Sequence, residues 1–138
     1  MDLNVSSGRV VLENVTSLKP NEIFVFGSNL LGVHGAGAAL LAYTEFGAAW
    51  GVGVGLTGNS YALPTKDRFI ETLPLDVIRD YIFEFIAFAR DNPHLHFLVT
   101  SVGCGLAGYT PRDIAPFFQE AMPLLNVSLP LAFWDVLC

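Results

Sequence analysis

The residues best suited to chemistry lie in two glycine-rich segments. The first, GSNLLGVHGAGA (residues 27–38), follows the apolar run IFVF (residues 23–26) and precedes small and apolar residues that favour a helix packed on a sheet. The second, GCGLAG (residues 103–108), follows FLVTSV (residues 97–102) and precedes TPRD (residues 110–113), which has the residue types of a helix start. Each segment is therefore predicted to be a turn from a buried strand into a helix.

Turns of this kind suit an anion. Glycine lets a ligand approach the main chain without a Cβ in the way, and the first N–H groups of a helix lack intrahelical partners and carry the positive end of its dipole. In α/β sheets ligands bind outside the carboxyl ends of the strands, so two adjacent turns would clamp a diphosphate. Nine of the 13 glycines fall between residues 27 and 58, which favours a binding wall around residues 51–58 over glycines used only for packing.

Three side chains near these turns could take part in catalysis. Lys66 and Asp67 are predicted to lie at the end of a strand over residues 60–63. Lys66 could pair with phosphate or, when desolvated, attack a sugar carbon as an amine, and Asp67 could act as a base or orient a ribose hydroxyl. His34, within the first glycine turn, could contact the ligand or move a proton. The alternatives are a solvated Lys–Asp pair in a turn and a surface histidine.

A long helix is predicted between the two glycine-rich regions, over residues 72–92. Thr72 is expected to cap it, Pro74 suits its first turn, and Asn92 precedes a proline that would stop it. One face carries an apolar stripe at helical spacing, formed by Ile78, Tyr81, Ile82, Phe85, Ile86 and Ala89. This stripe is interpreted as core.

Shorter elements complete the predicted pattern. Residues 9–13 and 126–130 are expected to be short strands, and a helix over about residues 36–46 is expected to end at Gly47. Pro116 is expected to distort the helix that follows residues 110–113. Because apolar strands alternate with helices, the sequence predicts an α/β fold with helices on both faces of a mixed sheet, in a single domain over residues 1–138.

Composition and charge exclude several classes of protein. Hydrophobic residues make up 52% of the chain and charged residues 14%, which excludes a disordered chain. The formal charge of −6 makes general nucleic-acid binding unlikely, since that needs clustered Lys and Arg. No apolar segment is long enough to span a bilayer, and the N-terminus lacks the order of a signal peptide. The two cysteines form no disulfide framework, so a reducing cytoplasm is the expected location.

The sequence supports neither a Rossmann dinucleotide site nor a metal site. The pattern G-x-G-x-x-G occurs at residues 53–58 and 103–108, but the first is not followed by a helix start. The second has no carboxylate about twenty residues later to hold a ribose, so a Rossmann domain is rejected. His94, His96 and Cys104 do not have the spacing of metal ligands. No cofactor and no metal are expected.

The order of motifs resembles the macrodomain family. Along the chain these are FVFGSN, LLGVHGAGAA, a predicted helix, a glycine-rich segment, YALPTK, a second helix and LVTSVGCGLAG. They are most similar to the small branch that includes the terminal ADP-ribose glycohydrolases and the DNA ADP-ribosyl hydrolase antitoxins, and to compact macrodomain-like proteins of bacteria and phages. The resemblance covers roughly residues 22–130, and the motifs are far more specific together than singly.

The resemblance implies a three-layer α/β/α fold with ADP-ribose in a cleft at the strand ends. It implies that Ser28 and Asn29 lie near the distal ribose, and that Lys66 matches the lysine that attacks the anomeric carbon in the glycohydrolases. The catalytic candidates are then Lys66, Asp67 and His34. The ligand-binding residues expected on this basis are Gly27, Ser28, Asn29, Gly35, Ala36, Gly37, Gly103, Cys104, Gly105, Leu106, Ala107, Gly108 and Tyr109.

The chain departs from that branch at two places. An aspartate that follows GCGL in the branch and assists the lysine is replaced by Ala107, so Asp67 or His34 would have to substitute for it. The Gly-Asp pair whose acid contacts adenine in many macrodomains has no counterpart after the first strand. A second role is also open for Asn29, because asparagines in loops often only stabilise turns.

The sequence therefore predicts an ADP-ribose-binding, macrodomain-like hydrolase that acts at the distal ribose of an ADP-ribose derivative. Backbone N–H groups of the two glycine turns would hold the diphosphate. The alternative is a non-catalytic protein that binds or sequesters ADP-ribose or a related NAD-derived nucleotide, which needs no acid or base and suits Ala107. A remoter alternative is a phosphatase that acts on ADP-ribose 1″-phosphate.

Overall fold

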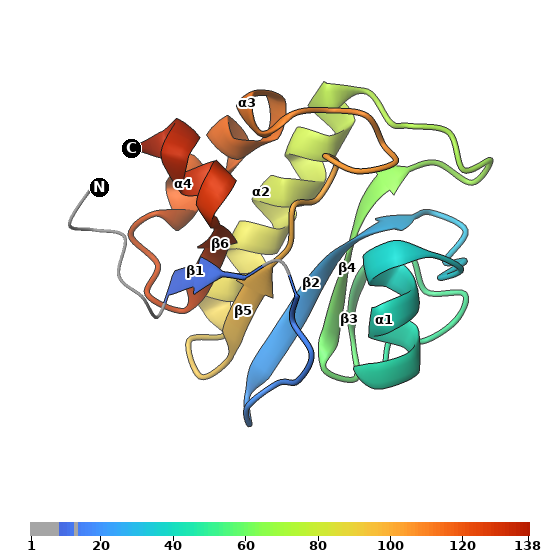
Figure 1. The fold of residues 1–138 in the computed structure, drawn as a ribbon, viewed down its shortest axis with the longest axis horizontal. Coiled ribbons are helices and arrows are strands. Elements are labelled where there is room, and N and C mark those ends of the chain that lie inside the picture. The colour runs from blue at the N-terminus through green and yellow to red at the C-terminus, as the bar shows by residue number, and fades with distance from the viewer. Residues whose placement is uncertain (1–8, 13) are drawn as a thin grey trace.

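The longest strand, β2 (Glu22–Asn29), runs through the middle of the sheet. The computed structural model describes residues 9–12 and 14–138. Within them six strands lie in the order β1-β6-β5-β2-β4-β3 (Figure 1). All neighbouring pairs are parallel except β3 and β4, which are antiparallel. The other strands are β1 (Val10–Val11), β3 (Gly55–Thr57), β4 (Ser60–Lys66), β5 (His96–Val99) and β6 (Val127–Pro130).

Helices cover both faces of this sheet. Alternate side chains of β2 point to opposite faces, so Phe24 and Phe26 belong to one apolar cluster and Ile23 and Val25 to the other. The first cluster includes α1 (Gly37–Glu45). The second is covered by α2 (Leu75–Asp91), α3 (Pro111–Ile114), the 3₁₀ helix η2 (Ala115–Ala121) and α4 (Leu131–Leu137). The predicted α/β class with a mixed central sheet is confirmed.

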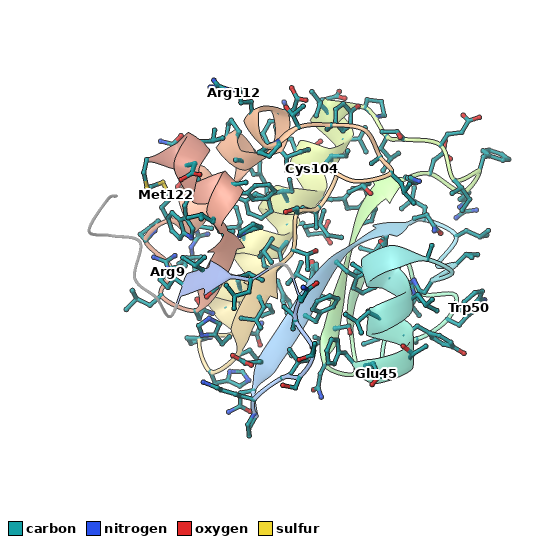
Figure 2. The ribbon with its side chains drawn as sticks, viewed as in Figure 1. Arg9, Glu45, Trp50, Cys104, Arg112 and Met122 are labelled. Carbon is teal, nitrogen blue, oxygen red and sulfur yellow. The ribbon has the colours of Figure 1, made fainter. Side chains whose placement is uncertain are left out.

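The two ends of the described chain are joined by one arginine. The guanidinium of Arg9 (Figure 2) donates to the carbonyls of Val127, Met122 and Ala121, at 3.0, 2.8 and 3.1 Å. It also lies 4.9 Å from the centre of the Trp134 ring, whose Nε1 donates to the Arg9 carbonyl at 2.9 Å. Burial lowers the pKa of Arg9. These contacts anchor β1 against β6 and α4.

Several local predictions are confirmed. The apolar stripe of α2 faces the core, with Ile78, Ile82 and Phe85 fully buried. Thr110 caps α3 in a capping box with Asp113. Gly47 follows α1 with φ of 79°, as a glycine after a helix end should, and η2 shows the distortion expected around Pro116.

Other boundaries differ from the predictions. β2 continues through Gly27 to Asn29 and β4 through Pro64 to Lys66, because the two strands pair along these residues. β5 ends at Val99, three residues early. α2 begins at Leu75, and the Thr72 hydroxyl donates to the Ala107 carbonyl at 2.9 Å instead of capping the helix. β3 and α4 were not predicted, and Glu13 of the predicted first strand lies outside the described residues.

The predicted binding wall around residues 51–58 is wrong. None of these residues lines the cavity at the strand ends described below. Their glycines let backbones touch: a Cβ on Gly53 would overlap the carbonyl of Asn29, and one on Gly58 would lie 2.5 Å from the carbonyl oxygen of Gly47. Gly53 and Gly58 are therefore explained by packing of the β3–β4 hairpin against its neighbours. Gly51 and Gly55 meet no atom and instead have positive φ, of 89° and 95°.

Candidate functional site

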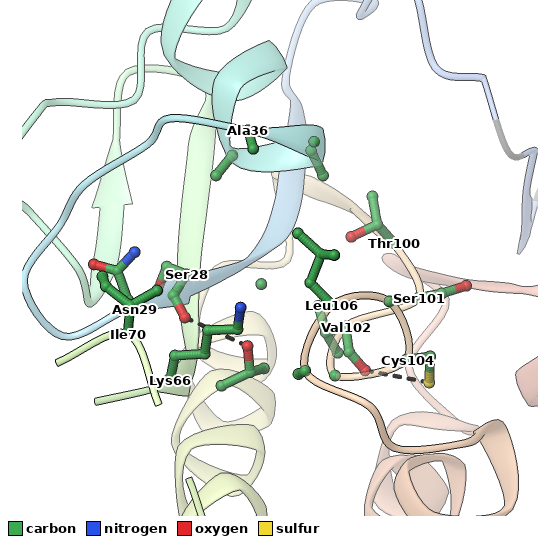
Figure 3. Close-up of a pocket in the computed structure, with 18 of the residues that line it drawn as sticks. Ser28, Asn29, Ala36, Lys66, Ile70, Thr100, Ser101, Val102, Cys104 and Leu106 are labelled. Atoms are coloured by element: carbon green, nitrogen blue, oxygen red, sulfur yellow. Dashed lines mark hydrogen bonds between the residues drawn. The ribbon is translucent and has the colours of Figure 1, made fainter. Parts of the chain in front are cut away.

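A cavity of about 590 Å³ opens where β2, β4 and β5 end. The end of β2, the turn into α1, the end of β4, and the segment after β5 all contribute to it (Figure 3). The two glycine-rich turns thus lie on the same cavity, as their positions after neighbouring parallel strands imply. Its lining residues are Gly27, Ser28, Asn29, Val33, Gly35, Ala36, Gly37, Ala38, Ala39, Thr65, Lys66, Ile70, Thr100, Ser101, Val102, Gly103, Cys104, Gly105, Leu106 and Ala107.

The N-terminus of α1 presents free donors to this cavity. Ala36 occupies the N-cap position, where it offers no side-chain acceptor, and the first turn holds no acidic residue. Within the described chain no backbone or side-chain acceptor takes the N–H groups of Gly37, Ala38 or Ala39, and the first bond of the helix runs from Leu40 to Ala36 at 3.2 Å. These donors carry the positive end of the helix dipole.

The loop after β5 supplies a second group of donors. Its ends are closed by bonds from the Tyr109 N–H to the Gly103 carbonyl at 2.9 Å and from the Gly108 N–H to the Gly105 carbonyl at 3.0 Å. The N–H groups of Gly105, Leu106 and Ala107 have no acceptor within the described part of the chain. A Cβ built on Gly105 meets no atom within 4 Å, so this side of the loop is open.

Lys66 is the one lining side chain, within the described residues, that is charged at neutral pH. It is the last residue of β4, and in Figure 3 its amine points away from the strand into the space between Ala36 and Leu106. No carboxylate of the described chain lies within ion-pair distance of its amine. Cys104, the other titratable lining group, is neutral because burial, reinforced by Asp113, raises the pKa of its thiol to about 11. The side chains of the cavity therefore carry one positive charge and no negative charge.

The side chains of Ser28 and Asn29 are engaged by the protein itself. Ser28 is buried and its hydroxyl donates to the Gly53 carbonyl. The Asn29 amide donates to the carbonyl of Val33 at 2.8 Å, and its oxygen accepts the Val33 N–H at 3.0 Å. Asn29 thus holds the turn that follows β2, which is the turn-stabilising alternative raised for it.

Asp67 does not line the cavity. One carboxylate oxygen accepts the N–H groups of Phe69 and Glu71, at 2.8 and 3.0 Å. The Asp67 N–H in turn donates to the Glu71 carbonyl at 2.8 Å. The carboxylate therefore organises the loop between β4 and α2, and it forms neither the solvated pair with Lys66 nor a contact with the cavity.

His34 lies outside the cavity and has no exposed surface, so the surface alternative is wrong. Its ring packs edge-on against Phe26 with centroids 5.3 Å apart, and it contacts Tyr43 and Trp50. Nε2 lies 2.9 Å from the Ala49 carbonyl oxygen, whereas Nδ1 has no partner within the described residues. This packing places His34 among the aromatic residues beside α1.

Two further expected ligand residues, Gly108 and Tyr109, are not on the cavity surface. The Tyr109 hydroxyl donates to the Leu73 carbonyl at 2.8 Å and ties the loop after β5 to the start of α2. The cavity also contains residues that sequence reasoning missed, above all Ile70, Thr65 and Thr100. Thr65 and Thr100 sit at ends of strands, a position that could have identified them, whereas Ile70 reaches the cavity only through the fold of its loop.

No family model matches this sequence, and comparisons with curated proteins and with solved structures found no significant match. Within the described residues no helix is long and apolar enough to cross a membrane. The same residues contain no group of three His, Cys, Asp or Glu side chains placed to hold a metal ion.

Proposed function

We propose that this chain is a macrodomain-like protein that binds a nucleotide diphosphate of the ADP-ribose class in the cavity at the strand ends. One observation carries the proposal. A cavity of about 590 Å³ has a single lysine as its charged side chain, and two turns with free backbone N–H groups line it. Backbone donors at a helix start and a lysine are the groups that hold phosphates in many proteins.

The size and charge of the cavity support this class of ligand. Cavities that hold small ligands have volumes of about 300–1,000 Å³, and two phosphates with attached sugars fit this range. The chain as a whole carries a formal charge of −6, yet the cavity side chains carry none of the acidic groups. A binding site that avoids carboxylates in an acidic protein favours an anionic ligand.

Binding without turnover fits the site better than hydrolysis does. Attack by Lys66 on a ribose carbon would need a neutral amine and a group to exchange protons with the leaving group. Asp67 is bonded to two backbone N–H groups, His34 is packed among aromatic rings, and position 107 is alanine. We therefore place the non-catalytic binder first.

Hydrolysis at the distal ribose remains the second candidate because of Lys66. Its amine is not neutralised by any carboxylate of the described chain and points into the cavity in Figure 3. If Lys66 is a nucleophile, Lys66→Ala removes turnover of an ADP-ribosylated substrate and ADP-ribose itself still binds. If the protein only binds, the wild type shows no turnover.

Calorimetric titration with ADP-ribose tests the binding proposal, with AMP and ribose 5-phosphate as controls. ADP-ribose is expected to bind well above both. Lys66→Ala is expected to weaken binding about 10- to 100-fold, as for loss of a charged hydrogen-bond donor to phosphate. Lys19→Ala, which removes the same charge from an exposed position before the start of β2, should bind as wild type does.

A second variant tests the backbone donors. Gly105→Val adds bulk where a Cβ meets nothing, so the fold should persist while the side chain obstructs the cavity. Loss of ADP-ribose binding with an unchanged melting temperature is expected. Failure of millimolar ADP-ribose to bind the wild type, or undiminished binding by both Lys66→Ala and Gly105→Val, would overturn the proposal.

A further inference from the structure

The loop between β4 and α2 holds one residue in an unfavourable backbone conformation. Ile70 has φ of 62°, and within the described residues Asn21 is the other non-glycine residue with positive φ. Asparagine tolerates this conformation, whereas a β-branched side chain there is an outlier. The Ile70 side chain is 44% exposed and belongs to the lining of the cavity, so the core does not require it there. Such outliers persist where the surrounding structure imposes them, and they cluster at ligand sites.

Asp67 imposes this conformation. Its carboxylate oxygen accepts the N–H groups on either side of Ile70, those of Phe69 and Glu71, at 2.8 and 3.0 Å. The Ile70 N–H donates to the Asp67 carbonyl at 3.2 Å. A bridge between Lys66 and Thr72 closes the ends of the loop. The loop is thus rigidly built around a single acid, and it holds Ile70 against the cavity.

A second aliphatic side chain belongs to the same cavity. Leu106 lies in the glycine loop after β5, is 83% exposed and also lines the cavity. The two loops are in contact, because the Thr72 hydroxyl donates to the Ala107 carbonyl at 2.9 Å. Lys66 lines the same cavity as these two side chains (Figure 3). Two exposed aliphatic groups, on loops that are in contact, thus share the cavity with its charged side chain.

We propose that Ile70 and Leu106 form a clamp for a planar, uncharged ring of the bound ligand. This inference rests on the proposed function and adds a specificity to it. The cavity should bind nucleotides with an uncharged ring more tightly than it binds sugar phosphates or inorganic phosphates. Aliphatic side chains bury the large apolar faces of a planar ring, whereas a charged phosphate gains nothing from them and a sugar has less apolar surface to bury. Lys66, without a carboxylate beside it, would repel a cationic ring.

Asp67 is a positioning residue in this clamp. It acts on the ligand through Ile70, since its carboxylate is bonded to the loop and does not line the cavity. This role differs from that of a catalytic base in a way that can be measured. Asparagine retains the oxygen that accepts both N–H groups, so Asp67→Asn should preserve the clamp, whereas Asp67→Ala should release it.

The test compares ADP-ribose with inorganic pyrophosphate, which has the diphosphate but neither ring nor sugar, on the full chain by calorimetry. Ile70→Ala and Leu106→Ala are each expected to weaken ADP-ribose about tenfold and to leave pyrophosphate unchanged. Phe69→Ala is the matched control, because Phe69 is in the same loop, is 82% exposed and does not line the cavity. It should bind both probes as wild type does.

The outcomes separate the clamp from the anion site. If Ile70→Ala and Leu106→Ala bind ADP-ribose no more weakly than Phe69→Ala, the clamp is overturned even where Lys66→Ala still lowers affinity. If the wild type does not bind ADP-ribose, the proposed function fails and the clamp with it. Asp67→Asn should keep wild-type affinity for ADP-ribose and Asp67→Ala should lose about tenfold. Equal losses in these two variants would refute the positioning role.

Discussion

The positive φ of Ile70 predicts that glycine at this position is more stable than alanine, which is the reverse of the usual order. Replacement by alanine or glycine removes the same side-chain atoms beyond Cβ, so the loss of their contacts largely cancels between the two variants. Alanine keeps a Cβ at φ of 62°, which costs about 1–2 kcal/mol. Glycine avoids that cost but loses about 0.5–1 kcal/mol through the greater freedom of the unfolded chain. The midpoints of these two ranges predict that Ile70→Gly exceeds Ile70→Ala in free energy of unfolding by about 0.75 kcal/mol, and the largest difference they allow is about 1.5 kcal/mol.

Urea denaturation followed by tryptophan fluorescence measures this difference in a chain with two tryptophans. Leu106 provides the control, because it lies in a loop of the same cavity and does not have positive φ. There glycine should be less stable than alanine by about 0.4–1 kcal/mol. A result in which Ile70→Gly is no more stable than Ile70→Ala would refute the assignment of strain to Ile70 and with it the argument that Asp67 imposes it.

Two further predictions follow from shifted pKa values. Burial, reinforced by Asp113, raises the pKa of the Cys104 thiol to about 11. Iodoacetamide should therefore modify Cys104 far more slowly than the exposed Cys138 at pH 8, as measured by mass spectrometry. The rate of Cys104 modification should keep rising about tenfold per pH unit up to pH 10. A rate that levels off below pH 9 would contradict the raised pKa. Burial lowers the pKa of His96, and its Nε2 lies 2.6 Å from the Ser128 hydroxyl. The contribution of neutral His96 to stability is therefore present above the unfolded pKa, near 6.5. It is lost as the pH falls through the lower pKa of the folded state. Between pH 7.5 and 5 the urea midpoint of the wild type should fall more than that of His96→Gln, and equal falls would contradict the assignment.

Local residue patterns determined much of this fold. The apolar stripe of α2, the capping box at Thr110 and the glycine after α1 each depend on residues within one or two helical turns, so their physics is present in the sequence. The two glycine-rich turns were also readable, because each follows an apolar strand and precedes a helix. Parallel pairing of β5 with β2 and of β2 with β4 then brings both turns and Lys66 to one edge of the sheet.

Tertiary contacts decided the roles of individual side chains. His34 and Asp67 are polar residues next to glycine turns, and nothing in their neighbours distinguishes a ligand contact from a structural one. His34 is structural because it packs against Phe26 and Trp50. Asp67 is structural because its carboxylate accepts hydrogen bonds from the backbone of residues 69 and 71. Gly53 and Gly58 likewise allow close approaches to Asn29 and Gly47 that only the folded chain creates.

Some features of the cavity could likewise be predicted from the sequence, and others depend on the tertiary structure. The backbone donors on which the proposed phosphate site depends could be predicted, since free N–H groups at a helix start and in a glycine loop follow from residue types and local geometry. The position of Ile70 could not, because a β-branched residue is not expected at φ of 62° and is held there by hydrogen bonds on both sides. The sequence alone thus located the two glycine turns that line the cavity, and the tertiary structure decided which side chains surround them, because side-chain placement depends on contacts between segments that are distant along the chain.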